Sequence, residues 1–149
     1  MINKRTSHLV ILLLILNLTL ITGCTVKYVS DYDGAIKEEI VLVAKKVDLF
    51  WGNLLDTNAE ERKYELFKET YNEIETDIRG LVMKNEIRPL NKESTRQAEI
   101  LLNLWMEDKK IHKESDTFKD FIAKQHRRQY VRIFTAMAKG EEAKKNSPE

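Results

Sequence analysis

Three histidines, His8, His112 and His126, are the residues of this chain that could most readily bind a metal ion. A di-iron carboxylate site in a helical protein needs two Glu-x-x-His pairs, but the residues three before His112 and His126 are Lys109 and Ala123. On neighbouring antiparallel helices joined near residue 115, His112 and His126 would lie about 12 Å apart along the helix axis. The sequence therefore predicts no metal site, and we interpret His126 as a core histidine.

Nucleophilic and cofactor-binding motifs give no stronger signal. The chain contains no Gly-x-Ser-x-Gly, no His-Glu-x-x-His and no glycine-rich loop before a helix. Its single cysteine excludes both c-type haem attachment and an intramolecular disulfide. Glu75 and Asp77 point to different sides of a helix, which makes them a poor acid–base pair. We therefore expect no catalytic residues, no cofactor and a protein that is not an enzyme, with a hydrolase as the least favoured alternative.

The first 23 residues combine a basic start, an apolar centre and small residues near the end. Lys4 and Arg5 precede an apolar stretch over residues 9–20. This three-part layout is typical of a secretory signal. The stretch is shorter than the roughly 20 apolar residues that a membrane-spanning helix needs. We expect residues 1–23 to be a cleaved signal peptide.

The only cysteine, Cys24, directly follows residues 20–23, whose sequence is Leu-Ile-Thr-Gly. This arrangement resembles the lipobox of bacterial lipoprotein precursors, in which a small apolar motif ends in an obligatory cysteine. The resemblance implies cleavage before Cys24, attachment of a diacylglyceryl group to its sulfur, and a tether over residues 24–30. Because several acyl chains hold a small domain stably on a bilayer, Cys24 would be a permanent anchor. Thr25 stands where this class often carries an aspartate for inner-membrane retention, which favours the outer membrane and a domain facing the periplasm.

Apolar residues recur at helical spacing through the remainder of the chain. Residues 36, 40, 43, 47, 50 and 54 predict a first helix over about 32–56. Thr57 and Glu60 have the spacing of a capping box, which predicts the start of a second helix there. Pro89 predicts a turn, after which Asn91 or Ser94 would cap a third helix. Asp116 is expected to cap a fourth.

Gly140 is the predicted end of the fourth helix, and residues 140–149 are expected to form a polar, disordered tail. Four helices of similar length with short connections predict an all-α protein, an antiparallel up-down-up-down four-helix bundle over residues 31–139. The alternative is a longer helical hairpin that completes its core by dimerising. The oligomeric state is left open.

Charged residues form two one-sided groups on the predicted helices. The acidic group recurs every four residues on the second helix and comprises Glu61, Glu65, Glu69, Glu73 and Asp77. The basic group lies on the outward face of the fourth helix and comprises Lys124, Arg127, Arg128 and Arg132. A solvated surface explains both groups, and the alternative is that they bind partners. The net charge of +1 provides no field for nucleic acid, which we do not expect as a partner.

These observations favour a lipid-anchored envelope protein that acts as a non-enzymatic interaction or assembly module. Its expected partners are the membrane, through acylated Cys24, and an envelope protein of unknown identity. In this hypothesis one charged side docks a protein, while the basic side meets anionic envelope material such as lipid headgroups. The alternative is a lipoprotein that binds a small apolar ligand in a pocket among Phe50, Trp51, Tyr71, Trp105 and Phe121. A close-packed interior would favour the interaction module over the ligand-binding protein.

Overall fold

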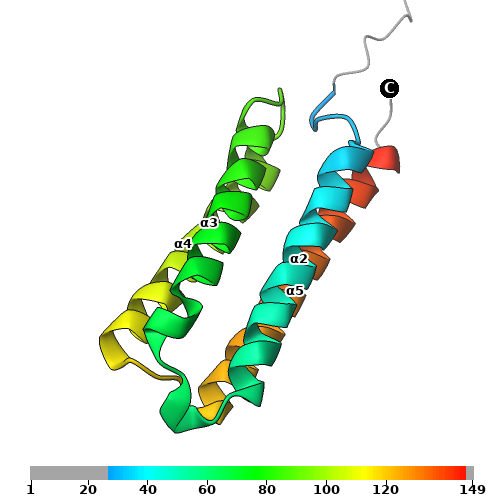
Figure 1. The fold of residues 1–149 in the computed structure, drawn as a ribbon. Coiled ribbons are helices and arrows are strands. Elements are labelled where there is room, and N and C mark those ends of the chain that lie inside the picture. Colours follow the sequence, from blue (N-terminus) through cyan, green and yellow to red (C-terminus); the bar gives the residue numbers. More distant parts are fainter. Residues whose placement is uncertain (1–26, 147–149) are drawn as a thin grey trace, which may run out of the picture.

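The structure is a computed structural model that describes residues 27–146. Four helices run alternately up and down (Figure 1), and no strand occurs in this part of the chain. Their bounds are α2 (Gly34–Asp56), α3 (Tyr64–Glu86), α4 (Lys92–Ser115) and α5 (Asp120–Ala143), with short 3-10 turns η1 (Ala59–Glu61) and η2 (Lys144–Asn146). The predicted all-α four-helix bundle is confirmed. The expected signal peptide and Cys24 lie outside the described residues.

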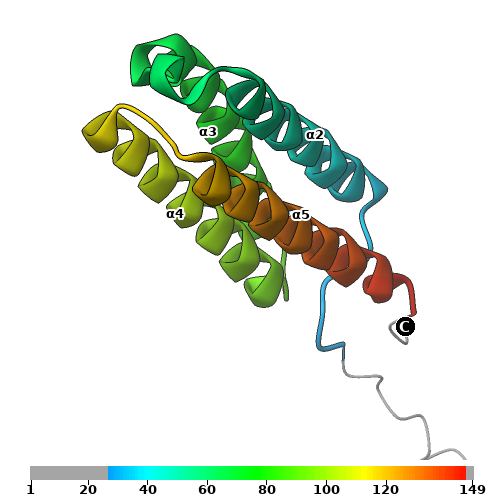
Figure 2. The same cartoon turned by 90° about the horizontal axis from the view of Figure 1, so that it is seen from below.

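The bundle consists of two closely packed helix pairs. α2 makes its most extensive contacts with α5, the helix furthest from it in the sequence, and α3 makes its own with α4. Figure 2 shows the four helices in a ring in which α3 and α5 are separated by α2 on one side and α4 on the other. Among the helices of residues 27–146, none has both the length and the apolar character needed to cross a membrane.

Aromatic side chains fill the centre of the bundle. Phe50 of α2 lies 4.5 Å from Tyr71 and 5.0 Å from Trp105, measured between ring centroids. Trp51 stacks on Tyr130 of α5 at 6.0 Å. The Trp105 Nε1 group donates a 3.0 Å hydrogen bond to the Tyr71 carbonyl oxygen, so this polar group is satisfied inside the core. All five side chains are almost fully buried, which gives the interior the close packing of a folded core.

The start of α3 differs from the prediction. Thr57 does not cap this helix but follows the end of α2, where its hydroxyl donates to the Asn53 carbonyl oxygen. Residues 59–61 form a 3-10 turn, and α3 begins only at Tyr64. The capping-box prediction is therefore wrong, because the local spacing of Thr57 and Glu60 says nothing of the tertiary contacts around this loop.

Asp116 has a different role from the predicted one. It ends α4 in the left-handed region, with φ of 53°, and α5 starts four residues later at Asp120. Its Oδ1 accepts a 3.0 Å hydrogen bond from the backbone N–H of Tyr64. Asp116 therefore accepts from the free backbone N–H at the start of α3, 52 positions earlier in the sequence, and does not cap the start of α5.

The end and the inner face of α5 also differ from expectation. The helix continues through Gly140 to Ala143, so the predicted disordered tail is wrong for residues 140–146. The helical spacing of apolar residues from Phe118 to Met137 predicts Ile122 on the inner face. Ile122 is exposed instead, whereas Ala123 and Phe134 are buried. The buried stripe continues to Glu141, whose charge made it look like part of a solvated tail.

Candidate functional site

His112 is fully buried at the end of the bundle where α2 meets α3 and α4 meets α5. Its Nε2 lies 2.8 Å from the Arg62 carbonyl oxygen, and its Nδ1 lies 3.3 Å from the Tyr71 hydroxyl. Since a carbonyl oxygen only accepts, Nε2 carries the proton and Nδ1 accepts from Tyr71. Burial lowers the pKa of His112, against the opposing effect of its bond to Arg62. The imidazole is thus held neutral as part of the core.

The partner of His126 comes from another helix. Its Nδ1 lies 2.8 Å from Oδ1 of the buried Asp108 of α4, although the angle between them is not that of a hydrogen bond. The Tyr130 hydroxyl donates a 2.7 Å hydrogen bond to Oδ2 of the same carboxylate. Asp108 therefore joins α4 to α5 through two polar side chains.

The two described histidines belong to separate clusters. The ring of Phe118 lies between them, 5.0 Å from the His112 centroid and 5.8 Å from that of His126. Among residues 27–146, no group of three or more histidine, cysteine, aspartate or glutamate side chains could hold a metal ion. Packing explains both histidines, and His112 also has a hydrogen-bond partner at each ring nitrogen.

Most of the acidic group reaches solvent. Glu61, Glu65, Glu69 and Glu73 are exposed, and Glu61 lies in η1 rather than in α3 itself. Asp77 is half-buried and forms a 2.7 Å ion pair with Lys46 of α2. The side is less uniformly acidic than the sequence suggested, because Leu66 is 69% exposed among these carboxylates. The acidic group is thus mainly a surface of α3, with Asp77 serving the α2–α3 contact.

The basic group divides into paired and unpaired residues. Arg127 is half-buried and binds both carboxylate oxygens of Asp48 of α2, at 2.6 and 2.7 Å. This bidentate contact lowers the pKa of Asp48, so the pair stays ionised. Lys124 lies 3.7 Å from Asp120. Within residues 27–146, Arg128 and Arg132 are exposed and have no carboxylate within ion-pair distance.

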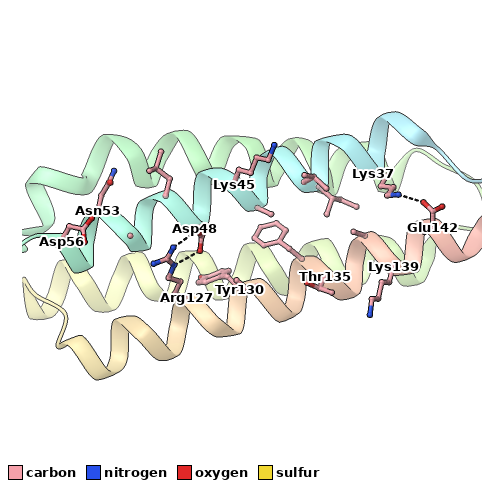
Figure 3. Close-up of a pocket in the computed structure, with 18 residues that line it drawn as sticks. Lys37, Lys45, Asp48, Asn53, Asp56, Arg127, Tyr130, Thr135, Lys139 and Glu142 are labelled. Carbon is pink, nitrogen blue, oxygen red and sulfur yellow. Dashed lines mark hydrogen bonds and ion pairs between the residues drawn. The ribbon is translucent and has the colours of Figure 1, made fainter.

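An open groove of about 800 Å³ lies on the outside of the bundle between α2 and α5. We call it the α2–α5 groove; it lies between residues 37–56 of α2 and 127–142 of α5. Figure 3 shows two ion pairs that cross it, Asp48–Arg127 near the middle and Lys37–Glu142, at 2.5 Å, near one end. Between these pairs the lining is mainly apolar, with Ala44 and Phe134 among its residues. No local sequence pattern predicts this groove, because it forms only where two helices that are distant in the sequence meet.

The pocket suggested by the sequence does not form from the residues named for it. Phe50, Trp51, Tyr71 and Trp105 pack against one another or against neighbouring rings in the core. Phe121 is 70% exposed and points away from them. An apolar hollow is present instead on the outside of the bundle, in the α2–α5 groove.

The end of the bundle where α2 begins and α5 ends is held by a buried carboxylate. Glu141 of α5 accepts hydrogen bonds from the Asp33 backbone N–H at 2.8 Å, from Arg88 at 3.0 Å and from Lys144 at 2.6 Å. Burial opposes ionisation of Glu141, but these bonds outweigh it and keep its pKa below the usual range. The segment that leads into α2 is therefore fixed to the α3–α4 turn and to the end of α5.

A second buried charge holds the opposite end. Arg62 donates to the carbonyl oxygens of Thr57, Phe118 and Leu55, and its Nη2 lies 2.7 Å from Asp120. No sequence pattern predicts a structural role for Arg62 or for Glu141, since both look like ordinary surface charges in a polar loop or tail. Only the structure reveals that both side chains are buried and bind backbone groups of distant segments.

Comparisons with known proteins add no family to this description. No protein-family profile, curated protein or solved structure matches the chain significantly. The features that bear on function are therefore the sequence around Cys24 and the surfaces of the described bundle.

Proposed function

We propose that this chain is a lipid-anchored envelope protein, attached through Cys24 to the outer membrane and facing the periplasm, where it acts as a non-enzymatic interaction or assembly module. The support for the anchor is the position of the only cysteine, at the end of a signal-like segment. The support for the module is the structure of the bundle, whose aromatic interior is close-packed and whose opposite sides differ in charge.

The close-packed centre is the observation that carries the proposal. A protein that binds a ligand inside a bundle keeps a cavity between its helices, as the general rule for small-molecule sites requires. Here the four central aromatic residues expected to line such a cavity fill it themselves. Binding is therefore assigned to the outer surfaces, and the exposed carboxylates of α3 are the proposed protein-docking side.

The anchor is tested by growing cells with radiolabelled palmitate and comparing the chain with its Cys24→Ser variant. We expect the label in the parent chain alone, together with a shorter membrane-bound product. An unlabelled, uncleaved chain recovered from the cytosol would overturn the proposed address and with it the proposed function.

The docking side is tested by cross-linking in intact cells, followed by mass spectrometry. Reversing Glu65, Glu69 and Glu73 to lysine should remove the main cross-linked partner, because charge complementarity steers association. The matched control reverses three exposed glutamates of α4, Glu93, Glu99 and Glu107, and should retain the partner. Equal yields from both triple variants, at low and at high salt, would refute a role for the acidic group.

The α2–α5 groove favours one second candidate, a lipoprotein that binds an apolar ligand on its outside. This candidate predicts that a fluorescent fatty acid binds the purified parent chain. The Ala44→Trp variant, whose larger side chain would fill the groove, should bind it much more weakly. Binding that is unchanged in this variant would exclude the groove as a ligand site.

A further inference from the structure

The outer surface formed by α2 and α5 is more apolar than a solvated face requires. α2 buries one stripe in the core and exposes a second, in which Leu49 is 63% exposed and lies beside Val41 along the groove. Val131 of α5, 51% exposed, faces them from the other wall. A helix that is apolar on both faces is normally covered on both, and exposed apolar patches mark sites of protein or membrane contact.

Cations border this apolar surface. Lys45 of α2 and Lys139 of α5 stand on opposite rims of the groove and project away from it (Figure 3). Arg128 and Arg132 continue the same side along α5, where they surround Val131 in a second, smaller hollow. Within residues 27–146, none of these four side chains has a carboxylate at ion-pair distance, whereas two of the groove's carboxylates, Asp48 and Glu142, are already neutralised by pairs across it. The surface therefore offers unpaired positive charge beside apolar side chains.

We propose that the face of the bundle formed by α2 and α5 lies on an anionic phospholipid surface, with its cations at the headgroups and the apolar groove against the acyl region. Interfacial helices combine apolar and basic side chains in this way. The acidic group of α3 lies across the bundle from α5, so an anionic surface attracts one side and repels the other. The same arrangement turns the proposed protein-docking side away from the membrane.

The position of the tether is compatible with this orientation, which rests on the anchoring proposed above. Ser30 is bound to the Leu90 carbonyl oxygen at the end of the bundle where α2 begins and α5 ends. Cys24 precedes Ser30 by six residues, which span at most about 20 Å when fully extended. The Lys37–Glu142 pair marks the groove's end on the same side of the molecule. A lipid on Cys24 would therefore keep the α2–α5 face close to the bilayer.

A second copy of the chain fits this face less well. In a two-fold symmetric dimer each partner presents the same patch, so Lys45, Arg128, Arg132 and Lys139 would meet another basic surface. A small ligand would remain largely exposed in a groove that is open along its length, whereas ligand sites usually bury most of their ligand. An anionic lipid surface matches both the charge and the exposed apolar residues.

The proposal is tested on the lipidated full chain carrying one added thiol. Cys24 is the only natural cysteine, and lipidation blocks its sulfur, so a Val131→Cys variant has a single reactive site on the α2–α5 face. A Thr70→Cys variant supplies the control on the exposed side of α3. Each is labelled with a fluorophore and reconstituted into phosphatidylcholine vesicles that contain a quencher on the lipid chains, with or without phosphatidylglycerol.

We expect the label at position 131 to be quenched several-fold more than the label at position 70 in vesicles that contain phosphatidylglycerol, and high salt should reduce the difference. Adding Arg128→Glu and Arg132→Glu should also reduce this difference in quenching. The control changes, Lys110→Glu and Lys113→Glu on α4, should leave the difference unchanged. Equal quenching at both positions overturns the proposal. It is also overturned if cross-linking detects a dimer through the α2–α5 face and the label at position 131 is not quenched by the lipid.

Palmitate incorporation is measured on the same preparation. A chain that takes up palmitate but shows equal quenching leaves the proposed anchor in place and overturns only the assignment of the α2–α5 face. A chain that takes up no palmitate overturns the anchor and this orientation together.

Discussion

Buried polar side chains in the core of this bundle have specific partners, although within residues 27–146 the Trp51 Nε1 group and His126 Nδ1 make no hydrogen bond. His112 has an acceptor at Nε2 and a donor at Nδ1, and Asp108 is shared between Tyr130 and His126. His112 lies near the end of α4 and is buried on the same face as Trp105, since seven residues are about two helical turns. Its hydrogen-bond partners could not be predicted, because both come from segments 41 or more positions away.

The neutral state of His112 makes stability depend on pH. Because its pKa in the folded state is below the usual 6.5, the unfolded chain binds more protons at mildly acidic pH. The free energy of unfolding should therefore fall as the pH is lowered from 7.5 to 5. We would measure urea unfolding by the fluorescence of Trp51 and Trp105, both fully buried in the folded state.

A His112→Gln variant is the control for this pH dependence. It should be less stable at pH 7.5, but most of the loss between pH 7.5 and 5 should disappear. The carboxylates of Asp48, Glu75 and Glu141 have lowered pKa values, so the stability that they contribute is lost only at lower pH. An unchanged pH profile in the variant would contradict the role given to His112.

At the scale of the helices, apolar periodicity was a better guide than end signals. The stripe of α2 predicted from residues 36–54 is the buried one. The apolar residues of α3 at the same three- and four-residue spacing, from Tyr64 to Leu81, are buried as well. The predicted caps were less successful. Asp33 caps α2 by accepting from the N–H groups of Ala35 and Ile36, and it was not predicted. Thr57, which was predicted as a cap, lies at no helix start. Apolar burial acts along a whole helix, while one cap can be replaced by a contact from elsewhere.

Two helical glycines offer a test of these elements. A Cβ at Gly80 would meet its nearest neighbour, Glu39, at 3.8 Å, and one at Gly52 would meet Arg127 at 3.8 Å. Both are ordinary contacts, so Gly80→Ala and Gly52→Ala should each raise the free energy of unfolding by about 0.5–1 kcal/mol. The exposed Ala136→Gly exchange in α5 should lower it by a similar amount. Destabilisation by either alanine variant in urea unfolding would show that the glycine is needed for packing.

The whole molecule is held by one buried charge at each end. Arg62 joins the α2–α3 and α4–α5 loops, while Glu141 joins the segment before α2 to the α3–α4 turn and to α5. These contacts connect chain segments that apolar packing alone leaves free to fray. They also fix where the proposed tether leaves the bundle.

Removal of the buried carboxylate should destabilise the bundle strongly. Glu141→Ala leaves Arg88 and Lys144 without their shared partner, and losing one member of a buried ion pair costs about 3–5 kcal/mol. The adjacent Glu142→Ala variant removes a half-buried carboxylate whose pairs with Lys37 and Lys145 are open to solvent. It is the control and should change stability little, because such pairs contribute little. Urea unfolding measures both, and hydrogen exchange at the Asp33 amide should accelerate only in the first. Equal stabilities would contradict the structural role of Glu141.

The sequence by itself determined the number of helices, their approximate lengths and most of their inward faces. These follow from apolar residues at three- and four-residue spacing, a pattern that each helix carries alone and that only burial satisfies. Only the tertiary structure decided which helices are neighbours and how they align. The α2–α5 groove, the Asp108–His126 contact, the Asp116 cap and the buried Glu141 depend on that alignment, because each joins residues whose proximity no local pattern encodes.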